Sequence, residues 1–186
     1  MRDHVNLANT VTSVSLAVGF AALLLASGSV GVATVLVVIA AVLDGLDGVL
    51  ARRRGGDRTF GAQLDSLADL LAFCIVPAFA LQQAAEQDAL VVGAVVAGLF
   101  VLAGAWRLAR FALQHEPRHF VGLPTPAAGI LLMLLVLWAP VPAALLGAVA
   151  LSALMVSPMR VPTVPTVCSA AGAARRARRD DPADRE

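Results

Sequence analysis

Apolar residues fill six long stretches of this chain, and short polar or proline-containing segments separate them. A helix needs about 20 apolar residues to cross the hydrocarbon core of a bilayer. The pattern therefore predicts an all-α, polytopic integral membrane protein with about six transmembrane helices. We expect these helices over residues 11–27, 30–50, 62–82, 89–112, 124–139 and 141–157, within a membrane domain that covers residues 1–160.

The composition agrees with a membrane protein. Hydrophobic residues make up 59% of the 186 residues, charged residues make up only 15%, and the mean hydropathy is +0.81. These values differ strongly from those of a soluble globular domain. Cys74 and Cys168 have neither the number nor the spacing of a disulfide framework or a metal site, and we interpret Cys74 as a small buried hydrophobic residue.

The distribution of positive charge between the loops predicts the orientation of the helices, and in this chain arginine alone supplies it, since there is no lysine. The arginines gather at the N-terminus, in the loop after the second apolar stretch, at the end of the fourth stretch and in the loop after it, and in the C-terminal tail. By the positive-inside rule, both termini and the loop around residues 51–61 are expected on the cytoplasmic side of the cell membrane. Residues 11–27 also have features of a secretory signal peptide, but five further apolar stretches follow and favour a retained first helix.

The tail over residues 161–186 is rich in Arg, Ala, Pro and Asp, and it has no apolar period. This composition predicts disorder. Its arginines either form a solvated cluster that sets the topology or contact anionic lipid headgroups. Nucleic acid binding is not supported, since the chain has no folded basic domain with interleaved aromatic residues.

Four carboxylates, from Asp44, Asp47, Asp65 and Asp69, lie at the ends of two apolar stretches. The first two are three residues apart and the last two are four apart, so each pair projects from one helical face. Charged residues at the edge of a membrane helix are costly and are functional candidates by default. Because carboxylates held together repel, the cluster predicts a site for hard divalent cations such as Mg²⁺ or Mn²⁺.

The spacing from Asp44 onward is D-x2-D-G-x2-A-R-x8-G-x3-D-x3-D. It resembles the signature of the CDP-alcohol phosphatidyltransferases, and all the specified positions are filled. They are Asp44, Asp47, Gly48, Ala51, Arg52, Gly61, Asp65 and Asp69. The resemblance implies that the four aspartates hold two Mg²⁺ or Mn²⁺ ions and that Asp69 is also the general base.

The same resemblance implies a donor pocket for CDP-diacylglycerol, lined by Gly48, Ala51, Arg52 and Gly61. Asn9 and Thr12 are similar to an N-x-x-T motif that precedes the first helix in many members. These two residues either contact the donor headgroup or cap the start of a helix. Homodimers are usual in the family, so the resemblance also implies a homodimer.

Three further blocks resemble the phosphatidylserine synthases within this family: DSLADLLAFCIVP from Asp65, RLARF from Arg107 and FVGLPTPAA from Phe120. They imply L-serine as the acceptor alcohol. Ala72, Cys74 and Ala112 depart from the usual Ser, Gly and Asn of these blocks, and Ala112 replaces a residue at a candidate acceptor-contact position.

Arg107 and Arg110 suit an anionic acceptor, but they also fit a simple role in snorkelling and topology. Glycerol 3-phosphate and inositol phosphate are anionic as well, so charge leaves these two acceptors open. A transporter or scaffold is a further alternative. It is disfavoured because the carboxylates lie beside an arginine-rich loop, whereas transporters place such groups near the bilayer midplane.

Overall fold

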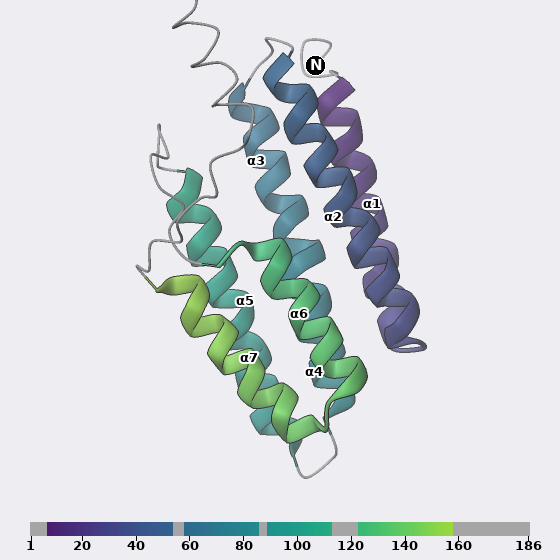
Figure 1. The fold of residues 1–186 in the computed structure, drawn as a ribbon, viewed down its shortest axis with the longest axis vertical. Helices are drawn as coiled ribbons and strands as arrows, with labels where there is room; N and C mark the ends of the chain where they lie inside the picture. Colours follow the sequence, from purple (N-terminus) through teal and green to yellow (C-terminus); the bar gives the residue numbers. More distant parts are fainter. Residues whose placement is uncertain (1–6, 54–57, 86–88, 113–122, 158–186) are drawn as a thin grey trace, which may run out of the picture.

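The computed structural model describes residues 7–53, 58–85, 89–112 and 123–157, and these residues form a bundle of helices without any strand (Figure 1). The elements in chain order are α1 (Leu7–Ala26), α2 (Val30–Arg53), α3 (Arg58–Asp69), the π-helical turn η2 (Leu70–Ile75), α4 (Val76–Ala84), α5 (Leu90–Ala112), α6 (Thr125–Trp138) and α7 (Val141–Val156). The predicted all-α fold is confirmed.

Helix α3, η2 and α4 form one continuous apolar helix with a widened turn in its middle. Within this turn the N–H of Val76 donates to the carbonyl of Leu71, five residues earlier. Pro77 follows directly, and a proline inside a helix has no N–H to donate and crowds the carbonyl four residues before it, which is that of Phe73. The π-helical turn is a local solution to this crowding, and such turns are frequent at functional sites.

Helices α1 and α2 run antiparallel along one side of the bundle, joined by a short turn (Figure 1). The residues buried between them are mostly small, for example Ala22, Ala26, Ala33 and Ala40. Small residues let helix backbones approach closely, which is the usual basis of helix association in membranes. Phe73 and Val76 belong to the same cluster, so the widened turn packs against this pair of helices.

A second cluster joins α4, α5, α6 and α7 around large apolar side chains, including Leu81, Phe100, Leu132 and Met155. Many large apolar residues on the outside of the bundle remain exposed, among them Val91 at 78% and Trp138 at 82%. An apolar exterior of this kind suits a lipid environment, because lipid tails are themselves apolar and the exposure of apolar side chains to them carries no hydrophobic penalty.

Three helical stretches are long and apolar enough to cross a membrane: Asn9–Ala26, Phe60–Ala84 and Leu90–Ala112. Shorter apolar helices cover Val30–Leu46, Thr125–Trp138 and Val141–Val156. The structure has a helical segment within each of the six apolar stretches, with its own bounds. The predicted disorder of residues 161–186 lies outside the described residues, and the division at residue 160 stays a prediction.

Candidate active site

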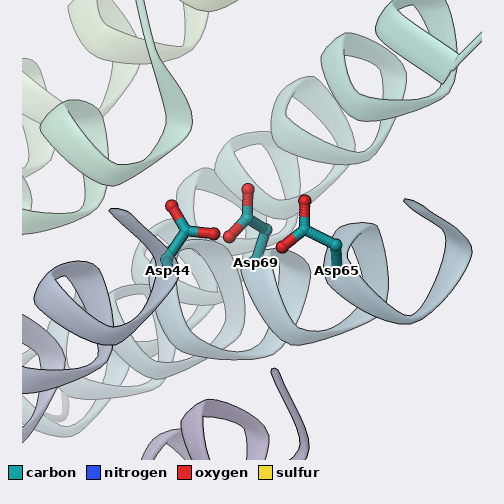
Figure 2. Close-up of side chains that lie close together, drawn as sticks. All are labelled: Asp44, Asp65 and Asp69. Carbon is teal, nitrogen blue, oxygen red and sulfur yellow. The ribbon is translucent and has the colours of Figure 1, made fainter. Parts of the chain in front are cut away.

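Three of the four predicted carboxylates converge from two helices, as Figure 2 shows: Asp44 from α2, and Asp65 with Asp69 from α3. Each offers a carboxylate oxygen, and these oxygens lie within 4.8 Å of one another. Asp65 and Asp69 share a face of α3 because they are four residues apart. The carboxyl groups of Asp44 and Asp69 lie within hydrogen-bonding range of each other.

The close approach of these side chains fits a metal site. All three are partly buried, and the charges of Asp44 and Asp65 act on Asp69. Ionised carboxylates only accept hydrogen bonds, so this arrangement needs a proton or a cation between the groups. A set of hard carboxylate oxygens is suited to a divalent cation such as Mg²⁺ or Mn²⁺.

The fourth predicted carboxylate, Asp47, belongs to α2, one turn beyond Asp44. Gly48, Ala51 and Arg52 follow in the last turns of the same helix. The helix runs as the signature spacing requires, but the side chains of these four residues lie outside the described part of the chain. Their roles as metal ligand and donor pocket stay predictions.

Asn9, Thr12 and Gly61 lie where α1 meets the start of α3. A Cβ atom on Gly61 would stand 3.0 Å from Oδ1 of Asn9, so the Asn9 side chain rests against the backbone of Gly61. Thr12 is buried one turn further along α1. The two predicted donor-side motifs, which are about fifty residues apart in the sequence, are therefore neighbours in space.

Arg107 on α5 lies within electrostatic range of Asp69. Its positive charge and the carboxylate of Asp69 attract each other. Its Nη1 donates a hydrogen bond of 2.8 Å to Oγ1 of Thr125, the first residue of α6. Its Nε is buried and has no hydrogen-bond partner among the described residues. Arg107 thus combines a fixed position with an unused donor close to the acidic cluster.

Arg110 has different surroundings. Its Nη1 donates to the carbonyl of Val156 at 3.4 Å, and Val156 is the last residue of α7. Its buried Nη2 has no hydrogen-bond partner within the described part of the chain. A cation at a helix C-terminus is stabilised by the unpaired carbonyls there. The structure therefore separates two arginines that the sequence left equivalent.

Sequence reasoning missed Thr125, and it missed the packing that holds the segment after Asp69. A Cβ on Gly129 of α6 would stand 2.5 Å from the carbonyl oxygen of Phe73, and one on Gly104 of α5 would overlap Sγ of Cys74. The only signal for Thr125 was its place in the GLPTPAA block. No spacing rule links it to Arg107, because their contact depends on how α5 and α6 pack.

Comparison with known proteins matches residues 5–159 to the CDP-alcohol phosphatidyltransferase family. A CDP-diacylglycerol–serine O-phosphatidyltransferase of Methanocaldococcus jannaschii is 35% identical over 133 residues, 72% of this chain and 61% of the relative. One of Helicobacter pylori is 42% identical over 105 residues, 55% of this chain and 44% of the relative.

An archaetidylserine synthase of Methanothermobacter thermautotrophicus is 35% identical over 153 residues, 78% of this chain and 65% of the relative. The chain thus spans between 44% and 65% of the length of these three curated relatives.

Proposed function

Because the chain belongs to the CDP-alcohol phosphatidyltransferase family, we propose that it transfers the phosphatidyl group of CDP-diacylglycerol to the hydroxyl of L-serine. The products are phosphatidylserine and CMP. One observation carries the proposal most directly: Asp44, Asp65 and Asp69 meet at one point, and the charge of Arg107 acts on Asp69. The names of the relatives, two CDP-diacylglycerol–serine O-phosphatidyltransferases and one archaetidylserine synthase, support serine as the acceptor.

The reaction needs one bond to form and one to break. The serine hydroxyl oxygen attacks the phosphorus that bears diacylglycerol, and the bond from that phosphorus to the bridging oxygen of the diphosphate breaks. CMP leaves with the bridging oxygen, and Asp69 accepts the hydroxyl proton. Two divalent cations held by Asp44, Asp47, Asp65 and Asp69 would neutralise the diphosphate and favour ionisation of the hydroxyl.

The donor side of the site lies between α1, α2 and α3. Gly48, Ala51 and Gly61 lack bulk, so a nucleotide can approach the backbone at these positions. Arg52 supplies a planar fork of donors for a phosphate. Asn9 supports this assignment, since it rests against the backbone of Gly61.

The acceptor side depends on Arg107 more than on Arg110. Arg107 has a buried, unused Nε and acts electrostatically on Asp69, where the hydroxyl loses its proton. Arg110 instead contacts the C-terminal end of α7. A carboxylate of serine bound to Arg107 would hold the neighbouring hydroxyl close to its base. Glycerol 3-phosphate or inositol phosphate, the second candidates, would present a phosphate to the same guanidinium.

The metal content, assembly and location complete the proposal. We expect two Mg²⁺ or Mn²⁺ ions, a homodimer, and a cell-membrane location with the site and both termini on the cytoplasmic side. The arginine asymmetry between the loops supports this orientation. Cysteines introduced at positions 54 and 119 should react with impermeant reagents only from the cytoplasm, and one at position 29 only from outside.

The decisive experiment measures CMP release from CDP-diacylglycerol by the purified protein, with each alcohol supplied separately. The proposal expects release with L-serine and little release with water alone, glycerol 3-phosphate or inositol phosphate. Release with one of the phosphorylated alcohols but not with serine would retain the family chemistry and overturn the acceptor. No release with any alcohol, in the presence of Mg²⁺ or Mn²⁺, would overturn the enzymatic assignment and favour a transporter or scaffold.

A further inference from the structure

We propose that Thr125 is a positioning residue that orients Arg107 so that the Nε–Nη2 edge of its guanidinium receives the carboxylate of the acceptor. This inference rests on the proposed function, because it assigns the residue that prepares the acceptor site. It starts from the single hydrogen bond between Arg107 Nη1 and Thr125 Oγ1, at 2.8 Å.

Thr125 is well suited to hold another side chain in place. It is 1% exposed, so its own position is set by the surrounding protein. It begins α6 between two prolines, and the carbonyl of Pro124 accepts a hydrogen bond of 3.0 Å from the N–H of Ala128. The preceding residue, Leu123, donates its N–H to the carbonyl of Leu154 at 3.3 Å, which ties the start of α6 to α7.

The bond to Thr125 determines which donors of Arg107 remain for a ligand. A guanidinium is planar and presents its donors in a fixed fork, which matches the two oxygens of a carboxylate. With Nη1 held by Thr125, the opposite edge, formed by Nε and Nη2, is the one available for bidentate binding. Nε is buried without a hydrogen-bond partner among the described residues, as expected for a donor whose partner is a bound ligand.

The same edge has to serve an acceptor whose hydroxyl reaches Asp69. Arg107 and Asp69 attract each other, so the guanidinium lies within electrostatic range of the carboxylate cluster. Serine is a short molecule, and its carboxylate and hydroxyl are separated by only two carbons. An arginine that rotated freely would bind the carboxylate in many orientations, and few of them would direct the hydroxyl to Asp69.

A purely structural role for Thr125 makes a different prediction. If the hydroxyl only provided a hydrogen-bond partner for a buried guanidinium, its loss would lower the stability of the protein. The ratio of the KM for serine to the KM for CDP-diacylglycerol would then stay as in the wild type. If it orients the guanidinium, its loss should weaken serine binding and leave the donor unaffected. The two roles therefore differ in the Michaelis constants and not only in the yield of folded protein.

The test compares Thr125→Val with Thr125→Ser in the full-length protein, purified in detergent and assayed for CMP release. Valine keeps the shape and removes the hydroxyl, and serine keeps the hydroxyl. We expect Thr125→Val to raise the KM for serine about tenfold or more, the effect of losing a hydrogen bond to a charged group. The KM for CDP-diacylglycerol should change less than about twofold, and Thr125→Ser should stay close to wild type.

Thr34→Val is the matched control. Thr34 is also buried, but its hydroxyl donates only to the carbonyl of Val30 within α2, at 2.8 Å. This variant should leave both Michaelis constants unchanged. If the Thr125→Val protein does not fold, Thr125→Ala supplies the same comparison with a smaller side chain.

Several outcomes would overturn the inference. Three results would exclude the positioning role even though the wild type turns over serine. They are an unchanged serine KM in Thr125→Val, an equal rise in the KM of both substrates, and a Thr125→Ser variant as impaired as Thr125→Val. A wild-type protein that releases no CMP with serine would overturn the proposed function and this inference together.

Discussion

The carboxylate side of the site and its arginine side are built in different ways. The carboxylate side, Asp44, Asp65 and Asp69, comes from two helices that are consecutive in the chain. The arginine side, Arg107, Arg110 and Thr125, depends on contacts of α5 with the start of α6 and with the end of α7. Arg107 and Thr125 are 18 residues apart, and Arg110 and Val156 are 46 apart.

This difference separates the part of the site that carries out the phosphatidyl transfer from the part that selects the acceptor alcohol. A metal and diphosphate site can be encoded by a short segment with fixed spacing, because helical periodicity brings the side chains of each helix to one face and the two helices are consecutive in the chain. An acceptor site requires groups from helices that pack together only in the finished fold. The acceptor side is thus free to change with the packing of α5, α6 and α7 while the transfer chemistry stays the same.

Removal of divalent cations should have the largest effect, because it disables the carboxylate side completely. In excess chelator, CMP release should fall to background, and Mg²⁺ or Mn²⁺ should restore it while Zn²⁺ restores it poorly. The measurement is initial rate against free metal concentration, with elemental analysis of the depleted protein. Full activity in protein shown to be metal-free would remove the metal from the mechanism.

Asp69→Asn should come next in size. The substitution removes a carboxylate that lies among the other two and that we assign as the base. General base catalysis contributes about 10²-fold or more, so kcat should fall at least that far while the protein still inserts and folds. Gln63→Ala, at an exposed position of the same helix, is the control and should retain wild-type kcat. A purified Asp69→Asn protein that kept more than about a tenth of wild-type kcat would exclude the base assignment.

Arg107→Gln tests the arginine side, with Arg110→Gln as its matched control. The loss of a charge-assisted hydrogen bond costs about 1.5–3 kcal/mol, so Arg107→Gln should raise the serine KM roughly 10- to 150-fold. The KM for CDP-diacylglycerol should change little. Arg110→Gln removes a contact with the end of α7 and should lower stability slightly without this kinetic change. A larger rise in the serine KM for Arg110→Gln than for Arg107→Gln would assign the acceptor site to Arg110 instead.

Much of the carboxylate side was predictable from the sequence. Asp65 and Asp69 are four residues apart on one helix, and the structure brings them to Asp44, as the signature spacing predicted. The helices themselves were also predictable from their apolar stretches, three of which are long enough within the described residues to cross a membrane. The fourth carboxylate, Asp47, remains a prediction.

The arginine side could not be predicted in the same way. Sequence alone left Arg107 and Arg110 equivalent, since both are arginines near the end of one helix. Their separation follows from tertiary packing, which directs one toward Thr125 and the other toward the carbonyl of Val156. The π-helical turn also escaped prediction. Pro77 was its visible sign, but the turn also packs against glycines of α5 and α6 that lie far away in sequence.

The smallest effect concerns this turn, which packs against both sides of the site. A Cβ on Gly129 would stand 2.5 Å from the carbonyl oxygen and 2.8 Å from Cα of Phe73, and backbone atoms cannot rotate away as a side chain does. Gly129→Ala should therefore destabilise the protein by about 1–3 kcal/mol, as overpacking usually does.

Gly98→Ala on α5 is the control, because nothing lies within 4 Å of the new Cβ. Alanine has a higher helix propensity than glycine by about 1 kcal/mol, so this variant should be as stable as wild type or slightly more stable. The measurement is the midpoint of thermal unfolding in detergent, together with residual CMP release below that midpoint. If α6 supports the helix segment that follows Asp69, Gly129→Ala should lower kcat even where the protein is folded. A lower midpoint with unchanged kcat would mean that this contact stabilises the bundle but does not position the base, and the two sides of the site would then be mechanically independent.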